Sequence, residues 1–217
     1  MRAGQPEGQR GSLKWIQKAV EKRPDTLQPS DLGRINWLSP TRHDDFAEYR
    51  DEAFLRLLGL SHLDASLNDF WPRRGPQWDA LGKAGDSVVL VEAKAHIGEF
   101  LTPGSKASDR SLQKIDAAFA QVRRSLTATG ATDWSVTYYQ YANRIAHLWW
   151  LRKNGVDAHL LFVSFLGDSD PAIKGPRCKE TWRAAYDAAD YALGLKKNHK
   201  LSRFVHHVMP EVADLNT

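Results

Sequence analysis

Asp79, Glu92 and Lys94 are the residues of this chain whose types and spacing best suit catalysis. Two facing carboxylates repel each other, and a divalent cation removes that repulsion. Ligands that are all oxygen, with room for water, suit Mg²⁺. A bound cation lowers the pKa of a water ligand and neutralises the charge that grows on a phosphate, while the lysine would orient that water and stabilise the transition state. Such a set of side chains suits the hydrolysis of phosphodiester bonds.

An antiparallel hairpin is expected to bring these residues together. Residues 78–83 and 86–95 have the pattern of strands, and residues 84–85 form a short turn between them. In that register Asp79 lies opposite Leu90, on the same face as the glutamate and the lysine. The second strand is apolar on both faces until its glutamate, so we expect it at the centre of a sheet covered on both sides.

The spacing of these residues resembles that of a known family. Asp79 is followed after twelve residues by Glu92-Ala93-Lys94, on a hairpin between two predicted helices. This arrangement is similar to that of the PD-(D/E)XK nuclease superfamily, over roughly residues 40–166. The resemblance implies a core of helix, three strands, helix and strand. It also implies cleavage of DNA that depends on Mg²⁺, for which Mn²⁺ can substitute.

We therefore expect an α/β fold with a restriction-endonuclease-like three-layer core of helix, three-strand meander, helix and strand. Residues 1–40 would form an N-terminal extension with one helix, and residues 41–217 the nuclease-like domain with a C-terminal helical extension. Apolar spacing predicts helices over residues 12–23, 44–58, 109–128, 135–153 and 179–193, and further strands over 158–166 and 203–209. Residues 25–40 have the composition of a polar linker.

A third acidic residue, from the first core helix, is implied by the same resemblance. Glu48 and Glu52 both lie in the helix predicted over residues 44–58. At 100° per residue, Glu52 lies at the margin of the apolar arc near Tyr49, whereas Glu48 points away from it. Glu52 is therefore the preferred auxiliary acid and third metal ligand. The alternative is that both glutamates are solvated and pair locally.

Basic and hydroxyl side chains near the hairpin are candidates for contact with phosphates. They are Arg73, Arg74, His96, Ser105, Lys106, Ser108 and Lys114. Each also has a structural interpretation: His96 as a polar strand end, residues 102–108 as the loop that caps the next helix, and Lys114 as part of a solvated helix face.

Composition limits the class of protein without choosing a partner. The 217 residues carry 30 basic and 26 acidic side chains, and the difference of +4 is compatible with a polyanionic partner. Cys178 is the only cysteine, and no apolar run is long enough to span a membrane, so we expect a soluble cytoplasmic protein. Cutting both strands of DNA would favour a homodimer. The alternatives are a non-catalytic nucleic-acid-binding or assembly module, and an α/β protein in which Glu92 and Lys94 form a structural ion pair.

Overall fold

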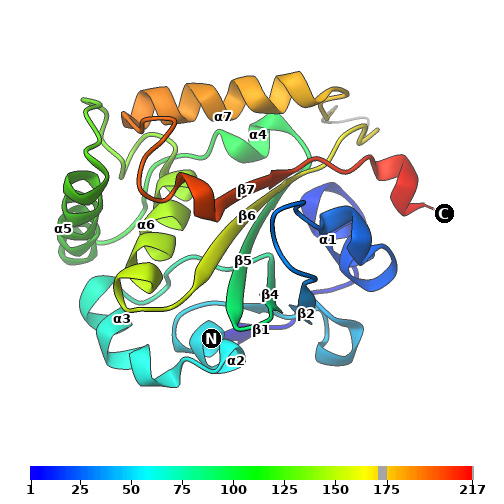
Figure 1. Ribbon diagram of the computed structural model, residues 1–217, viewed down its shortest axis with the longest axis horizontal. Helices are drawn as coiled ribbons and strands as arrows, with labels where there is room; N and C mark the ends of the chain where they lie inside the picture. The colour runs from blue at the N-terminus through cyan, green and yellow to red at the C-terminus, as the bar shows by residue number, and fades with distance from the viewer. Residues whose placement is uncertain (171–174, 217) are drawn as a thin grey trace.

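A five-stranded mixed sheet forms the centre of the protein (Figure 1). The computed structural model describes residues 1–170 and 175–216. The strands follow the order β2 (Asn36–Ser39), β4 (Ala80–Ala84), β5 (Ser87–Lys94), β6 (Ala158–Ser164) and β7 (Val205–Val208). The first three are antiparallel neighbours, whereas β6 and β7 run parallel to β5. The sheet and its helices confirm the α/β class.

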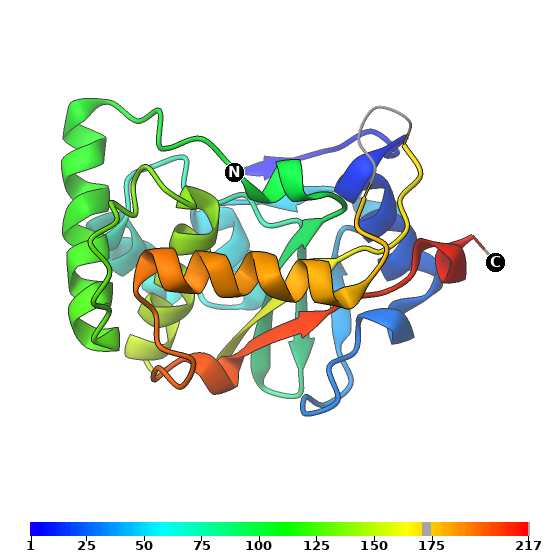
Figure 2. The same cartoon turned by 90° about the horizontal axis from the view of Figure 1, so that it is seen from above.

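Helices lie on both sides of the sheet and at one end of it. They are α1 (Gly11–Lys22), α2 (Glu52–Leu58), α3 (Asp64–Phe70), α4 (Ile97–Phe100), α5 (Asp109–Leu126), α6 (Tyr139–Lys153) and α7 (Lys179–Leu193). The helices predicted over 109–128 and 179–193 are confirmed as α5 and α7. Both views place α5 at one end of the molecule, outside α6 (Figures 1 and 2).

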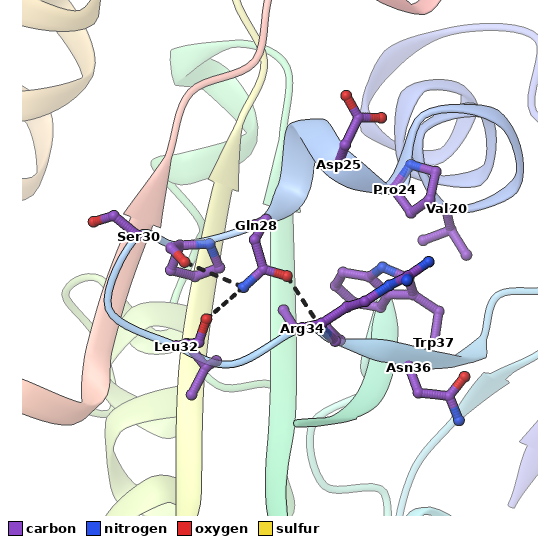
Figure 3. Close-up of a pocket in the computed structure, with 11 residues that line it drawn as sticks. Val20, Pro24, Asp25, Gln28, Ser30, Leu32, Arg34, Asn36 and Trp37 are labelled. Atoms are coloured by element: carbon purple, nitrogen blue, oxygen red, sulfur yellow. Dashed lines mark hydrogen bonds between the residues drawn. The ribbon is translucent and has the colours of Figure 1, made fainter. Parts of the chain in front are cut away.

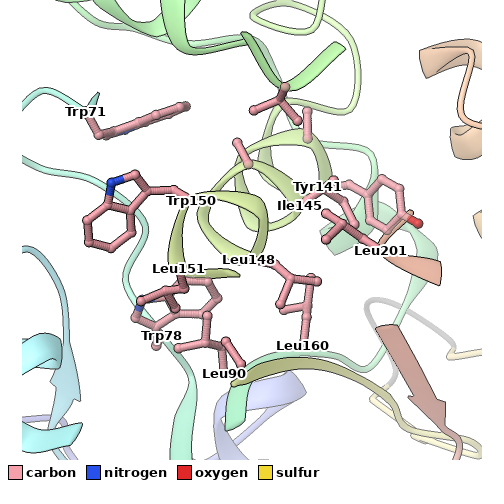
Figure 4. Packing of buried hydrophobic residues seen from close by; sticks show 14 of the residues in the cluster. Trp71, Trp78, Leu90, Tyr141, Ile145, Leu148, Trp150, Leu151, Leu160 and Leu201 are labelled. Atoms are coloured by element: carbon pink, nitrogen blue, oxygen red, sulfur yellow. The ribbon is translucent and has the colours of Figure 1, made fainter. Parts of the chain in front are cut away.

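Successive side chains of β5 point to opposite faces of the sheet, and they belong to two separate core clusters. Val88 and Leu90 belong to the cluster that contains α6, and Val89 and Val91 to the cluster that contains α1. On the first side, aliphatic and aromatic side chains of α6 pack onto β5 and β6, as Figure 4 shows around Leu148. The predicted burial of this strand on both faces is confirmed, since its residues from 88 to 94 are all buried.

The helix predicted over residues 44–58 is wrong in its first half. Asp45, Phe46 and Asp51 have φ values of 49°, 48° and 54°, which a right-handed helix excludes. Between them runs β3 (Glu48–Tyr49), which pairs with β1 (Arg2–Ala3). The apolar spacing that resembled one helical face reflects burial of side chains on separate elements, and a helix begins only at Glu52.

Residues 1–40 pack against the rest of the chain. The segment 25–40, predicted to be a linker, contains the edge strand β2, in which Trp37 pairs with Gly82 of β4. The buried face of α1, which includes Ile16 and Val20, covers one side of the sheet next to Val91. In Figure 2, α1 lies at the opposite end of the molecule from α5. The N-terminal segment thus supplies a strand and the cover of one sheet face.

Candidate active site

The hairpin of β4 and β5 brings Asp79 and Glu92 into neighbouring positions. Pairing runs from Ala84 with Ser87 to Ala80 with Val91, so the turn is Gly85-Asp86. Asp79 directly precedes β4, and its amide donates to the carbonyl of Val91 over 3.2 Å. The predicted register is therefore wrong by two residues, because the turn begins at a glycine with a φ of 60°. A shift of two keeps every side chain on its predicted face, so Asp79 lies opposite Glu92 on the face that carries Lys94.

Asp79 is fixed by the strand opposite. Its Oδ2 atom accepts a hydrogen bond of 2.7 Å from the amide of Ala93, the residue between Glu92 and Lys94. Burial, and then the charge of Glu92, raise the pKa of Asp79 well above its ordinary value. Its Oδ1 atom accepts no hydrogen bond from the described residues. This carboxylate therefore has one oxygen available and a charge that lacks full compensation.

Glu92 is buried and shared by two cations. Its Oε1 atom accepts a hydrogen bond from Nζ of Lys94, and its Oε2 atom accepts one of 2.6 Å from Nε of Arg144. Burial disfavours its charge, but Arg144 and Lys94 together hold the pKa of Glu92 below its ordinary value. Burial likewise opposes the charge of Lys94, yet Glu92 and then Asp79 raise the pKa of this lysine. The pair is therefore ionised at neutral pH.

Arg144 and Gln140 are site residues that the sequence analysis missed. They lie four residues apart on α6, so both face β5. Gln140 accepts a hydrogen bond of 3.1 Å from Nζ of Lys94 through its Oε1 atom. Arg144 also donates to the carbonyl of Gln77 over 2.8 Å, and its guanidinium lies 4.9 Å from the centre of the Trp78 ring. An arginine among the apolar residues of a predicted core helix was the available signal, because a buried charge requires a partner.

The structure brings Glu48 to this site and leaves Glu52 away from it. Glu48 is buried, and its Oε2 atom accepts hydrogen bonds from Gln5, at 3.1 Å, and from Gln77. Burial raises the pKa of Glu48, as does the charge of Glu92. Glu52 instead begins α2 and accepts a hydrogen bond of 3.1 Å from Asn68. The backbone amide at this helix start lowers the pKa of Glu52.

An open pocket of about 370 Å³ exposes the cluster to solvent. Asp79, Glu92, Lys94 and Arg144 all line it, together with Gln140. A substrate that enters this pocket meets two carboxylates and two cations on one wall. A phosphodiester flanked by a metal ion would match that pattern of charge.

The carboxylate oxygens of the pocket belong to the type of ligand that a hard divalent cation prefers. No group of three or more His, Cys, Asp or Glu side chains within residues 1–170 and 175–216 is arranged to hold a metal ion. Asp79 and Glu92 would supply two carboxylates, and water would complete the coordination, as Mg²⁺ prefers. Burial, and then the charge of Glu92, raise the pKa of Asp79 and of Glu48, and a cation bound beside them would favour their charged forms.

A second, adjoining pocket gathers most of the predicted phosphate-binding residues. It has a volume of about 440 Å³ and is lined by Arg73, Arg74, Ser105, Lys106 and Ser108. We call it the basic pocket. Arg74 also lines the pocket of the carboxylates, so the two pockets are neighbours.

The two remaining predicted contacts lie outside the basic pocket. Lys114 donates from Nζ to the carbonyl of Asn68. His96 is buried, and its Nε2 atom lies 3.1 Å from Oε1 of Glu99. Both side chains therefore make contacts within the protein itself.

The pocket of largest volume among those described, about 1020 Å³, lies elsewhere, beside β2 (Figure 3). Trp37 lines this pocket, and its charged lining residues are Asp25 and Arg34. The side-chain amide of Gln28 bonds to the surrounding loop. Its Oε1 atom accepts a hydrogen bond of 3.1 Å from the amide of Ile35, and its Nε2 atom donates one of 2.7 Å to the carbonyl of Leu32. These polar groups support the loop and form no constellation for catalysis.

Comparison with known proteins adds no family to these observations. In the part of the chain that the structure describes, no helix has the length and apolar character needed to cross a membrane. The chain matches no protein-family model, no curated protein and no solved structure.

Proposed function

We propose that this protein is a Mg²⁺-dependent nuclease that hydrolyses phosphodiester bonds, with DNA as the favoured substrate. The observation that carries the proposal is the convergence of Asp79, Glu92 and Lys94 in one open pocket. Two further features support it. One is a sheet in which β2, β4 and β5 are antiparallel neighbours and β6, after three helices, runs parallel to β5, although β3, α2 and α3 lie between β2 and β4 in the chain. The other is the basic pocket alongside. A carboxylate pair beside cations is the chemistry that a phosphoryl centre requires.

Each side chain has a distinct task in this proposal. Asp79 and Glu92 hold the cation, and Glu48 stands beside them in place of Glu52 as the auxiliary acid. When bound, such a cation would lower the pKa of a water ligand and would neutralise charge on the phosphate. Lys94 is kept protonated by Glu92, so it acts as a positioning and stabilising cation and not as a base. Arg144 holds Glu92 in place from the opposite side.

The experiment is a cleavage assay with purified protein on plasmid, linear and single-stranded DNA and on RNA, with Mg²⁺, Mn²⁺ or EDTA. We expect cleavage with either metal and none in EDTA. Lys94→Ala should lose cleavage while Lys83→Ala, a lysine at the other end of the same hairpin, retains it. Absence of cleavage on every substrate, or an active Lys94→Ala variant, would overturn the proposal.

A second candidate is a nucleic-acid-binding module without turnover. The observation that favours it is that both oxygens of Glu92 already meet cations of the protein, Lys94 and Arg144. A carboxylate neutralised in this way is a weaker metal ligand. Tight binding of DNA in EDTA, with no cleavage in Mg²⁺ or Mn²⁺, would support the module and exclude the nuclease.

A further inference from the structure

The basic pocket has a surplus of positive charge. Arg73, Arg74 and Lys106 line it, and its lining contains no acidic side chain. All three cations are exposed, and none of them forms a hydrogen bond or an ion pair with the residues that the structure describes. The pocket therefore presents three cations; one of them, Arg73, also lies near Glu52 and helps to lower its pKa, after the backbone amide and Asn68.

Hydroxyl groups complete the lining. Ser105, Ser108, Ser111 and Tyr139 face the same pocket. Hydroxyls and cations around one concave surface are the donors that a phosphate group, with its several acceptor oxygens, requires. Lys and Arg with Ser hydroxyls are also the usual contacts to phosphate in nucleic-acid complexes.

The loop that carries these donors is tied to its neighbour. The amide of Ser105 donates to the carbonyl of Ser135 over 2.7 Å. Gly104 lies very close to the backbone of Val136: a Cβ atom added to Gly104 would lie 2.9 Å from the Cα atom of Val136. The loop is thus held against the segment before α6 before any ligand binds, which lowers the entropic cost of binding.

Size and charge together indicate the ligand. A volume of about 440 Å³ is that of a small-molecule site, enough for one nucleotide and too small for a duplex. An internal phosphodiester carries one negative charge, whereas a terminal phosphomonoester carries about two at pH 7. Three cations around one pocket match the terminal group better.

We propose that the basic pocket binds the terminal phosphomonoester of a single substrate strand. This inference rests on the proposed nuclease function and deepens it. Arg74 and Tyr139 line both pockets, so a phosphate held in the basic pocket leads the adjoining nucleotides toward Asp79 and Glu92. The protein then acts at phosphorylated strand ends. The 5′ and 3′ phosphates share this chemistry.

The test compares single-stranded oligonucleotides of one sequence with a 5′-phosphate, a 3′-phosphate or hydroxyls at both ends. We expect kcat/KM with Mg²⁺ to be about tenfold or more higher for one phosphorylated form, as suits charge-assisted contacts. The double variant Arg73→Gln/Lys106→Gln should lose this preference, so that the ratio of kcat/KM between the phosphorylated and hydroxyl forms falls to about one. Arg124→Gln, an exposed arginine in the last turn of α5, is the matched control and should keep the preference.

Binding of the same oligonucleotides in EDTA separates this inference from the nuclease proposal. Equal cleavage and equal binding of all three forms would overturn the pocket assignment and leave the nuclease intact. No cleavage, with about tenfold tighter binding of one phosphorylated form that the double variant loses, would support the pocket and overturn the nuclease. Neither cleavage nor binding would overturn both.

Discussion

Arg144 donates a hydrogen bond of 2.6 Å to Glu92 across 52 positions of sequence. This contact joins α6 to the central strand and places a positive charge beside a carboxylate that burial would otherwise disfavour. The same glutamate accepts a bond from Lys94 on its other oxygen. The stability of the sheet and the charge of the pocket are therefore coupled through a single side chain.

Replacement of Arg144 by alanine should lower the free energy of unfolding by about 1–3 kcal/mol, because Glu92 loses one of its two cations and keeps Lys94. Urea denaturation in EDTA measures this change. The double variant Arg144→Ala/Lys94→Ala removes both cations of Glu92 and should lose about 3–5 kcal/mol, the usual cost of a buried charge without a partner. If the single and double variants were equally destabilised, the electrostatic account of this pair would be wrong.

Lys94→Ala should reduce cleavage by about 10²–10³-fold, the range for loss of one stabilising donor in a catalytic site. Glu92 retains Arg144 in this variant, so the fold is preserved. Rates are compared at saturating DNA, with Lys83→Ala as the control from the same hairpin. A fall in DNA affinity without a fall in kcat would instead assign Lys94 to substrate binding.

Asp79→Asn should stabilise the metal-free protein at neutral pH. An unfolded Asp titrates near 3.9, whereas burial and Glu92 raise the folded-state pKa of Asp79 well above that value. Between about pH 4 and the raised pKa the folded state binds the extra proton, so the free energy of unfolding falls as pH increases. The substitution removes this slope and raises the melting temperature at pH 7.

Thermal unfolding from pH 4 to 8 in EDTA measures that slope, and Asp86→Asn in the exposed hairpin turn is the control that should keep it. Mg²⁺ should raise the melting temperature of the parent and leave that of Asp79→Asn unchanged, because a ligand stabilises only the state that binds it. An equal shift in both proteins would place the cation elsewhere.

Glu48→Gln and Glu52→Gln distinguish the two candidates for the auxiliary acid. Glu48 is buried, and burial and the charge of Glu92 raise its pKa, whereas Glu52 accepts a hydrogen bond from Asn68 at the start of α2. We expect Glu48→Gln to raise the Mg²⁺ concentration for half-maximal cleavage by about tenfold, as for loss of an outer-shell partner. Glu52→Gln should match the parent in a metal titration. The reverse result would restore the assignment made from the sequence.

The local pattern of apolar residues was sufficient to predict the elements that are long or buried on both faces. The apolar spacing of α5 and α7 and the uninterrupted apolar run of β5 each depend on neighbours a few residues apart, so the sequence predicts them well. The shared face of Asp79, Glu92 and Lys94 also follows from the alternation of a strand, and it survives the error in register.

Elements set by distant partners were not predictable in this way. β3 pairs with β1, some 46 residues earlier, and the positive φ of Asp45, Phe46 and Asp51 carries no strong sequence signal. Glu48 lies in β3 and not in a helix, so the helical face that was calculated for it has no meaning. Arg144 reaches Glu92 only because α6 packs on β5, a contact that spacing within either element cannot reveal.

The parallel pairing of β5 with β6 has a consequence for biosynthesis. On the ribosome the β4–β5 hairpin is complete long before residues 158–164 are made, because a parallel partner requires a long crossover. Until then one edge of an apolar strand is bare and prone to association with other chains. Glu92 also lacks Arg144 during this interval. A prematurely terminated chain therefore carries the acidic residues of the pocket without the assembled site.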